Sequence, residues 1–221
     1  MNKQRLAVMV MKEQGLLPLF YHDDPQICIA VAKALYNAGV RCIEFTNRGE
    51  KALENFKVLV NEREHSMPGL ILGVGTVKSP YDAVSFIENG ADFLVSPIFD
   101  KGVCDVAKKH NILWVPGCMT PTEIHVAQQA GCSLIKLFPG NLLAPAFVEA
   151  IQPLFNGLNY MVTGGVEVSE ASIEGWFKTG VSCIGLGSKL ITKDILLKGD
   201  YATLTSKTKE VLAIILKLKK V

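Results

Sequence analysis

The sequence predicts an α/β protein that folds as one (β/α)8 TIM barrel with a capping helix ahead of its first strand. Apolar runs of strand length recur 20 to 28 residues apart, and each is followed by a stretch with helical character. They begin near Leu16, Cys42, Leu70, Phe93, Leu113, Leu134, Tyr160 and Cys183. The length of 221 residues suits one such barrel. An open doubly wound sheet usually has fewer strands and leaves exposed edges. No linker interrupts the pattern, so residues 1–221 are expected to form a single domain.

Composition argues against several classes of partner. Hydrophobic residues make up 49% of the chain and the formal net charge is only +2. No long run of one charge sign occurs, so neither nucleic acid nor a membrane surface is expected as a partner. Residues 1–14 lack the apolar core of a signal peptide, and no segment reaches the roughly 18 apolar residues of a membrane span. The six cysteines show no close pairing, and most of them sit within apolar elements. Their even count leaves disulfides as the alternative, but reduced thiols and a cytoplasmic location are favoured.

The first elements follow from local signals. Lys3–Gln14 has the character of a short helix that covers one end of the molecule, and Leu16–Tyr21 is the first strand. Asp23 or Asp24 then caps a helix with Pro25 in its first turn. The inward face of that helix carries apolar side chains at helical spacing, namely Ile27, Val31, Ala34, Leu35 and Ala38. Gly39 ends it, and glycines at 90, 131 and 180 end later helices in the same way.

The sixth strand contains a lysine. In Ser133–Phe138 the alternation of a strand sends Leu134, Lys136 and Phe138 to one face, and both faces are otherwise apolar. A free lysine has a pKa of about 10.4, so only about one in a thousand is a nucleophilic amine at neutral pH. Burial lowers that pKa and thereby activates a lysine for Schiff-base formation. Lys136 is therefore the candidate catalytic amine, and Phe138 is expected to help keep it dry.

A carboxylate enters the barrel from the second strand. In Cys42–Thr46 the alternation puts Glu44 on the same face as Cys42 and Thr46, while Ile43 and Phe45 point toward the helices. Schiff-base chemistry needs a proton shuttle, and a glutamate within reach of the lysine is suited to act as general acid and base. The alternative is a structural ion pair between Glu44 and Lys136, which desolvation makes a costly way to gain stability.

The remaining polar residues follow the ends of other strands, where barrel enzymes keep their chemistry. Arg48 and Thr76 are suited to binding a carboxylate, although an isolated arginine after a strand is usually a surface residue. Glycines after the last two strands, at Thr163-Gly164-Gly165 and Gly185–Ser188, predict a phosphate site, with tight turns as the alternative. Ser96-Pro97 follows the fourth strand, and Thr163, Phe138 and Pro97 complete the expected pocket.

No metal or separate cofactor is expected. The four histidines at positions 22, 65, 110 and 125 have no metal-ligand spacing. The covalent Schiff base expected on Lys136 would do the chemistry without a cofactor.

The motifs resemble those of the class I 2-keto-3-deoxy-6-phosphogluconate (KDPG) and 4-hydroxy-2-oxoglutarate (KHG) aldolases, from about residue 16 to 190. The motifs that carry the resemblance lie at 39–48, 73–77, 135–139, 163–166 and 185–188. The resemblance implies that Lys136 forms a Schiff base with pyruvate and that Glu44 is the general acid/base. It also implies Arg48 and Thr76 at the pyruvate carboxylate, Gly164, Gly165 and Ser188 at the phosphate, and a metal-independent homotrimer.

Three departures from the family pattern touch the substrate mouth. Many members carry an arginine where this chain has Phe20-Tyr21-His22. Asn47 and Gly49 flank Arg48 where larger or hydroxylated residues are usual, and Gly140-Asn141 stands where a small residue and an acidic one are usual. These differences affect the expected aldehyde specificity and leave the Schiff-base chemistry unchanged.

The sequence therefore predicts a carbon–carbon lyase that cleaves KDPG to pyruvate and glyceraldehyde 3-phosphate. Alternative substrates for the same mechanism are 4-hydroxy-2-oxoglutarate and 2-keto-3-deoxy-6-phosphogalactonate. Two other classes are possible: a phosphate-binding barrel epimerase or isomerase, and a sugar-phosphate-binding barrel without turnover. A metal-dependent epimerase would need histidines and aspartates at strand ends, and these are not found.

Overall fold

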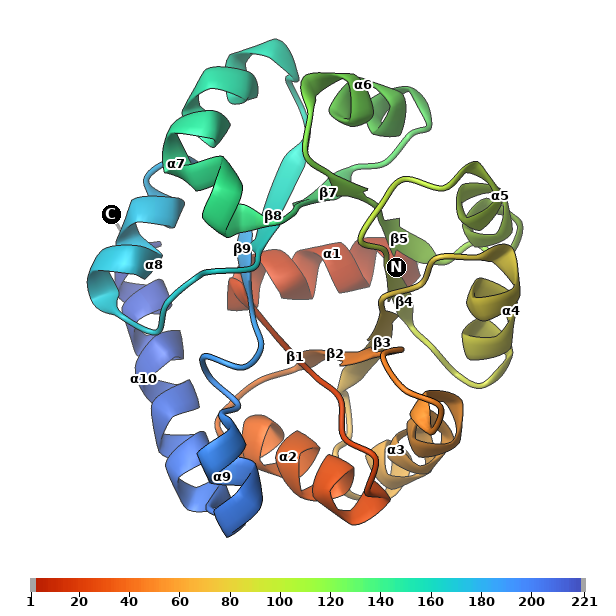
Figure 1. Ribbon diagram of the computed structural model, residues 1–221, viewed down its shortest axis with the longest axis vertical. Helices are drawn as coiled ribbons and strands as arrows, with labels where there is room; N and C mark the ends of the chain where they lie inside the picture. Colours follow the sequence, from red (N-terminus) through yellow and green to blue (C-terminus); the bar gives the residue numbers. More distant parts are fainter. Residues whose placement is uncertain (1–2, 220–221) are drawn as a thin grey trace.

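A computed structural model of the protein describes residues 3–219 and contains one nearly closed barrel of parallel strands (Figure 1). The strands lie in the order β5-β4-β3-β2-β1-β9-β8-β7-β6. Their bounds are β1 Leu16–Phe20, β2 Cys42–Thr46, β3 Ile71–Gly75, β4 Phe93–Val95, β5 Leu113–Val115, β6 Gly117–Cys118, β7 Leu134–Leu137, β8 Asn159–Thr163 and β9 Cys183–Leu186. The predicted fold class is confirmed.

Helices surround the barrel because most of them follow a strand and pack an apolar face back onto it (Figure 1). They are α1 Lys3–Gln14, α2 Pro25–Asn37, α3 Ala52–Ser66, α4 Pro80–Glu88, α5 Lys101–Lys109, α6 Pro121–Gln129, α7 Gly140–Ile151, α8 Glu170–Phe177, α9 Lys193–Lys198 and α10 Tyr201–Leu218, with a short 3₁₀ helix at Gln152–Leu154. Asp24 caps α2 by accepting a hydrogen bond from the Gln26 N–H, with Pro25 at the first position.

The fifth predicted strand is divided in two. Pro116 separates β5, which pairs with β4, from β6, which pairs with β7. Proline has no N–H for a ladder bond, so the chain changes partner there. The carbonyl of Pro116 still accepts a hydrogen bond from the Lys136 N–H at 2.8 Å, which joins this segment to β7. The division thus closes the ring between β4 and β7.

Two layers of apolar side chains fill the molecule. The outer layer lies between strands and helices and includes Ile43, Phe45, Ile135 and Leu137. The inner layer fills the barrel from the side where the strands begin, and it contains Leu17, Cys42, Ile71, Phe93, Val95, Leu113, Val115, Leu134, Met161 and Cys183. The alternation predicted for β2 and β7 is therefore confirmed.

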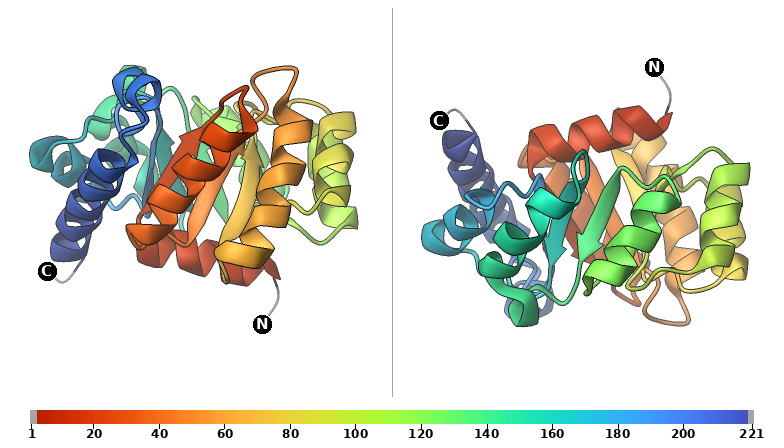
Figure 2. Two further views of the ribbon diagram at one scale, coloured as in Figure 1. Left: turned by 90° about the horizontal axis from the view of Figure 1, so that it is seen from below. Right: turned by 90° about the horizontal axis from the view of Figure 1, so that it is seen from above.

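Helix α1 forms the floor of the barrel. Its side chains Ala7 and Met11 are buried against the inner layer, and Figure 2 shows the helix lying across one end of the sheet. Its predicted bounds and covering role are confirmed. The last described residue, Lys219, donates from Nζ to the carbonyls of Lys12 and Glu13, the second at 3.2 Å. These bonds satisfy carbonyls at the end of α1 that have no partner within the helix.

Three smaller expectations can be compared directly with the structure. The first strand ends at Phe20, one residue earlier than predicted, because Tyr21 already belongs to the loop that leads to α2. All six cysteines are free, and five of them are buried. Within residues 3–219 no helix combines the length and the apolar character that crossing a bilayer requires.

Candidate active site

Lys136 and Glu44 both lie inside the barrel, above the apolar inner layer. Lys136 is on β7 between the outward-facing Ile135 and Leu137, and its side chain is 4% exposed. Glu44 is on β2 and is 1% exposed. An amine and a carboxyl group, each almost fully removed from water, therefore share the interior of one barrel.

Burial shifts the pKa values of these two groups in the directions that catalysis needs. Desolvation lowers the pKa of Lys136, and the positive charge of Arg48 lowers it further, while Glu44 opposes the shift. Desolvation raises the pKa of Glu44, against the charges of Lys136 and Arg48. The neutral amine and the protonated acid are both favoured relative to the same groups in water. A nucleophile and a proton donor are thus available together.

One carboxylate oxygen of Glu44 has no partner in the protein. This Oε2 atom is buried without a hydrogen bond, as are Oγ1 of Thr163 on β8 and the Tyr160 hydroxyl, which lies in the outer layer. Buried polar atoms nearly always have partners in folded proteins, so the two unpaired side chains inside the barrel, Glu44 and Thr163, are candidates for contact with a ligand. A purely structural ion pair would be expected to use both carboxylate oxygens.

Two inward-facing glycines make room for these polar side chains. A Cβ atom on Gly75 of β3 would overlap the Glu44 carboxylate, and one on Gly185 of β9 would overlap the Thr163 hydroxyl. Any larger residue on the neighbouring strand would push these groups out of place. The glycines were part of sequence motifs, but this space-making role was not predicted. Glycine at an inward strand position beside a polar residue was the available signal.

Arg48 and Thr76 lie at the carboxyl ends of β2 and β3. The Arg48 N–H donates to the Thr46 carbonyl at 2.9 Å, and the Arg48 side chain reaches out at the exposed mouth. Its charge acts on both Glu44 and Lys136, so the guanidinium is near the reacting groups. Thr76 has φ +63°, a left-handed conformation that is an outlier for a β-branched residue. Such strain is concentrated at functional sites.

Phe138 lies beside the Lys136 amine, and Pro97 lies just after β4. The Lys136 Nζ lies 4.9 Å from the centroid of the Phe138 ring. That ring shields the amine on one side, and it also lies close to Gly164, where an added Cβ atom would be 3.6 Å from it. Pro97 follows β4, and its carbonyl group lies directly against Gly117, which leaves no room there for a side chain. The Phe138–Pro139 peptide bond is cis.

The loops after β8 and β9 form a second part of the mouth. Gly164 and Gly165 have successive positive φ values of 94° and 72°, a conformation that glycine adopts without strain. Ser188 is exposed in the turn after β9, and Lys189 joins the two loops through an ion pair with Glu167 at 2.7 Å. Backbone N–H groups in turns can form concavities that bind anions, so these loops are the candidate anion site.

The start of α8 offers little positive charge to this part of the mouth. The helix begins only at Glu170, and its first turn is already capped by the Ser169 side chain, which accepts from the Ser172 N–H. Glu170 also places a negative charge in that turn. The glycine loop itself is therefore the candidate anion-binding element.

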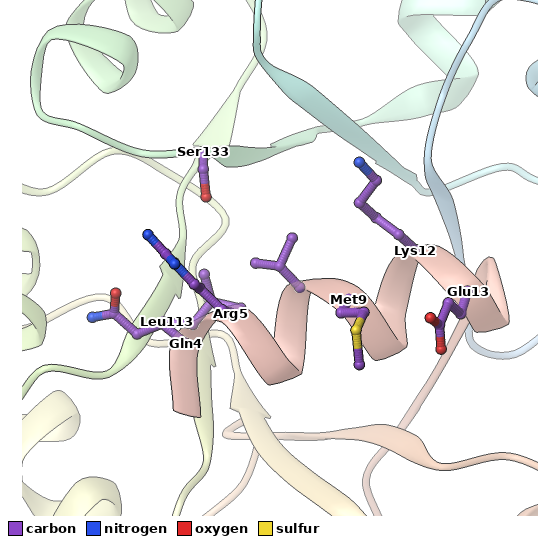
Figure 3. Close-up of a pocket in the computed structure, with 8 residues that line it drawn as sticks. Gln4, Arg5, Met9, Lys12, Glu13, Leu113 and Ser133 are labelled. Carbon is purple, nitrogen blue, oxygen red and sulfur yellow. The ribbon is translucent and has the colours of Figure 1, made fainter. Parts of the chain in front are cut away.

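One groove of the protein lies away from this mouth. A groove of about 560 Å³ lies at the opposite end, along α1, where Arg5, Val8, Met9 and Leu113 line it (Figure 3). It is separated from Lys136 by the inner apolar layer. Within the described part of the chain no three histidine, cysteine, aspartate or glutamate side chains gather closely enough to hold a metal ion.

Comparisons with known proteins agree with this geometry. The model of the family described as KDPG and KHG aldolase matches residues 8–207. A KHG/KDPG aldolase of Escherichia coli K12 is 30% identical over 213 residues, which cover 95% of this chain and 96% of the relative. The KDPG aldolase of Zymomonas mobilis ZM4, solved with 3-phosphoglycerate, is 25% identical with a TM-score of 0.83 over 96% of this chain and 97% of its own.

A third relative has the same fold at lower identity. The KDPG aldolase of Legionella pneumophila, solved with pyruvate captured as a covalent carbinolamine, is 22% identical with a TM-score of 0.85. The match covers 93% of this chain and 97% of that one. Because the family model spans nearly the whole barrel, from α1 into α10, the chain belongs to the KDPG and KHG aldolase family.

Proposed function

We propose that the protein is a class I aldolase that cleaves KDPG to pyruvate and glyceraldehyde 3-phosphate, with Lys136 as the Schiff-base amine and Glu44 as the general acid and base. The observation that carries this proposal is the pair of buried groups in one barrel, with opposite pKa shifts and an unpaired Glu44 oxygen. The covalent carbinolamine of pyruvate in the Legionella aldolase supports an amine-based mechanism for this chain as well.

The reaction can be followed through these two side chains. The neutral Lys136 amine attacks the C2 ketone, and protonated Glu44 gives a proton to the departing hydroxyl, so that water leaves and an iminium forms. The Glu44 carboxylate then takes the proton of the C4 hydroxyl while the C3–C4 electron pair moves into the iminium. The aldehyde leaves, and Glu44 returns the proton to C3 of the enamine, which restores the iminium. Water then hydrolyses the iminium to release pyruvate and the neutral amine, and the proton freed in this step returns to the Glu44 carboxylate.

The two ends of the substrate are assigned to the two parts of the mouth. Arg48 and Thr76 are proposed to bind the carboxylate next to the ketone. Gly164, Gly165 and Ser188 are proposed to bind the phosphate, and the 3-phosphoglycerate with which the Zymomonas aldolase was solved is a three-carbon phosphate ester, as is the glyceraldehyde 3-phosphate product. Thr163, Phe138 and Pro97 complete the pocket. Binding of the remote phosphate positions the C3–C4 bond for cleavage.

Trapping with borohydride tests the amine. The protein is incubated with pyruvate and sodium borohydride, and the expected product is a reduced pyruvate adduct on Lys136, detected by peptide mass mapping. Lys101 is an internal control, because its ion pair with Asp105 raises its pKa and keeps the amine protonated. The variant Lys136→Met should give no adduct. A parent protein that gives no adduct, or gives it elsewhere, would refute the mechanism.

A substrate panel tests the phosphate assignment and the alternatives. We expect kcat/KM to be highest for KDPG, ahead of 2-keto-3-deoxy-6-phosphogalactonate and 4-hydroxy-2-oxoglutarate. Ser188→Ala should lower kcat/KM for the two phosphorylated substrates about 10-fold, the effect of one lost charge-assisted hydrogen bond. The value for 4-hydroxy-2-oxoglutarate, which has no phosphate, should stay unchanged. Equal losses on all three would contradict the assignment.

The family resemblance supports further proposals about the whole protein. We infer a homotrimer that acts in the cytoplasm, needs no metal or separate cofactor, and comprises one domain. Light scattering coupled to gel filtration measures the trimer directly. Full activity after dialysis against a chelator would support the absence of a metal requirement.

A further inference from the structure

The loops that follow β1 and β2 are tied together at the mouth. The Asn55 side chain, buried at the start of α3, donates to the carbonyls of His22 at 3.0 Å and Asp23 at 2.8 Å. The Thr46 hydroxyl donates to the Phe20 carbonyl at 3.3 Å. The two loops therefore form one body, and a change in the first is transmitted to the second.

Tyr21 lies between these loops. Its ring packs on Phe45 with centroids 5.7 Å apart, and its hydroxyl donates to the Asp23 carboxylate. The backbone N–H of Lys51 interacts with the same hydroxyl oxygen. Burial and Asp23 raise the pKa of Tyr21 to about 12, so the hydroxyl remains a donor at any physiological pH. The side chain is thus held at its ring and at its tip.

The Tyr21 ring rests on Gly49, the residue after Arg48. A Cβ atom on Gly49 would overlap the Tyr21 ring and hydroxyl. Gly49 does not have a positive φ, so its backbone accepts alanine, and the three atoms that an added Cβ would meet most closely all belong to Tyr21. The Gly49 carbonyl accepts from the Ala52 N–H at 3.0 Å, which fixes the start of α3. The backbone of Arg48 is therefore held on one side by its hydrogen bond to the Thr46 carbonyl and on the other by Gly49, which Tyr21 covers.

We propose that Tyr21 is a positioning residue that, through its contact with Gly49, fixes Arg48 where it binds the carboxylate of the keto-acid substrate. This inference rests on the proposed function, in which Arg48 is the carboxylate ligand. Tyr21 touches no reacting atom. It acts by limiting the positions of the Asn47–Lys51 loop, so that the exposed Arg48 side chain starts from one backbone position. Tyr21 and Gly49 form a matched pair, a bulky residue on one loop and an absent side chain on the other.

A double-mutant cycle tests this pair with pyruvate as the probe. The variants are Gly49→Ala, Tyr21→Ala and the double variant, and the readouts are the half-saturating pyruvate concentration and the maximal rate of borohydride trapping at Lys136. We expect Gly49→Ala to raise the half-saturating concentration about 10-fold, because the Arg48 contact is weakened, with the maximal rate within about 2-fold. Tyr21→Ala should raise it about 3-fold or more.

The double variant gives the decisive comparison. Once the ring is gone, the three atoms that the added methyl group would overlap most closely are removed, so the double variant should trap pyruvate within about 2-fold of Tyr21→Ala alone. Its thermal midpoint should also recover the loss caused by Gly49→Ala. Effects that multiply, or an unchanged half-saturating concentration in Tyr21→Ala, would overturn the proposal. The comparison of Tyr21→Ala with the parent protein remains a test even if Gly49→Ala does not fold.

A matched control separates this proposal from a general effect of alanine. A Cβ atom added to Gly175, on α8, would have no other atom within 4 Å, and Gly175→Ala should leave the half-saturating concentration unchanged. The two proposals fail in different ways. A parent protein that never traps pyruvate on Lys136 contradicts the aldolase function itself. A parent that traps it normally, with all variants unchanged, contradicts only the role of Tyr21.

Discussion

At the scale of single residues, the proposed mechanism depends on an acid that has lost its water. Glu44 is 1% exposed and one of its oxygens has no partner, so the group is set up to exchange protons with a ligand. Removal from water also lowers the pKa of Lys136, because burial disfavours the charged form of an amine just as it disfavours the charged form of an acid. One dry compartment thus prepares both groups.

Replacing the acid tests its role. Glu44→Gln keeps the shape of the side chain and removes its ability to transfer protons, so the fold should persist while kcat falls about 10²–10⁴-fold, the usual contribution of general acid–base catalysis. Steady-state cleavage of KDPG measures the loss, and circular dichroism checks the fold. Near-normal turnover would remove Glu44 from the mechanism.

The same substitution has a predicted effect on stability that depends on pH. Because the pKa of Glu44 is raised in the folded chain, the folded protein holds this proton to a higher pH than the unfolded chain does. As pH rises above the ordinary glutamate value of 4.5, the parent loses free energy of unfolding relative to Glu44→Gln, until the raised pKa is passed. Below 4.5 both states are protonated and the difference is constant.

Urea unfolding of the two proteins at pH 4 and pH 7 measures this difference. We expect the advantage of Glu44→Gln over the parent to be larger at pH 7 than at pH 4. An equal difference at both values would mean that Glu44 titrates alike in the folded and unfolded chains, and that burial does not raise its pKa.

At the scale of elements, each polar group in the barrel depends on a neighbouring strand that lacks a side chain. Glu44 on β2 uses the space at Gly75 on β3, and Thr163 on β8 uses the space at Gly185 on β9. The site is therefore built by pairs of strands. A substitution of Gly75 on β3 should therefore lower the activity that depends on Glu44 on β2.

Gly75→Ala tests this dependence. The added methyl group would overlap the Glu44 carboxylate, so we expect a stability loss of about 1–3 kcal/mol from overpacking and a fall in kcat of about 10²-fold from the displaced acid. Unfolding in urea and cleavage of KDPG measure the two effects. Gly175→Ala on α8 is the control, since it should raise stability by about 0.5–1 kcal/mol with activity unchanged. Similar behaviour of the two variants would show that Gly75 has no special role.

Periodicity predicted the elements well, since the alternation in β2 and β7 and the cap of α2 depend only on neighbours in sequence. The division at Pro116 was not predicted, because the sequence does not show whether a proline ends a strand or interrupts it. The two cases differ only in which strands pair before and after the proline. The Tyr21–Gly49 contact was also missed. It joins residues 28 positions apart, on two loops whose approach no local pattern encodes.

At the scale of the whole molecule, the barrel separates stability from chemistry along its axis. The floor is apolar and is closed by α1, which lies across one end of the barrel (Figure 2), while Glu44 and Thr163, with their unpaired oxygens, lie beyond the inner apolar layer. We therefore expect the site to keep its geometry when the packing of the floor is changed. Substitutions at the two ends should have separable effects.

Met11 and Met9 on α1 test that separation. Met11 is fully buried, so Met11→Ala should lower the free energy of unfolding by about 2–5 kcal/mol through the cavity it leaves. Met9 is 37% exposed on the same helix, and Met9→Ala should change stability by less than about 0.5 kcal/mol. Urea unfolding measures both. The half-saturating pyruvate concentration should match the parent in each folded variant, and a shift in Met11→Ala would mean that the floor and the mouth are coupled.

The bond from Lys219 to the end of α1 has a practical consequence for handling the protein. It holds the last turn of α10 on the side of the barrel floor, where the first described helix also lies. A bead, chip or electrode linked at Lys219, or on the exposed side of α1, would therefore attach beneath the barrel. The immobilised protein would present its open face to the flowing solution.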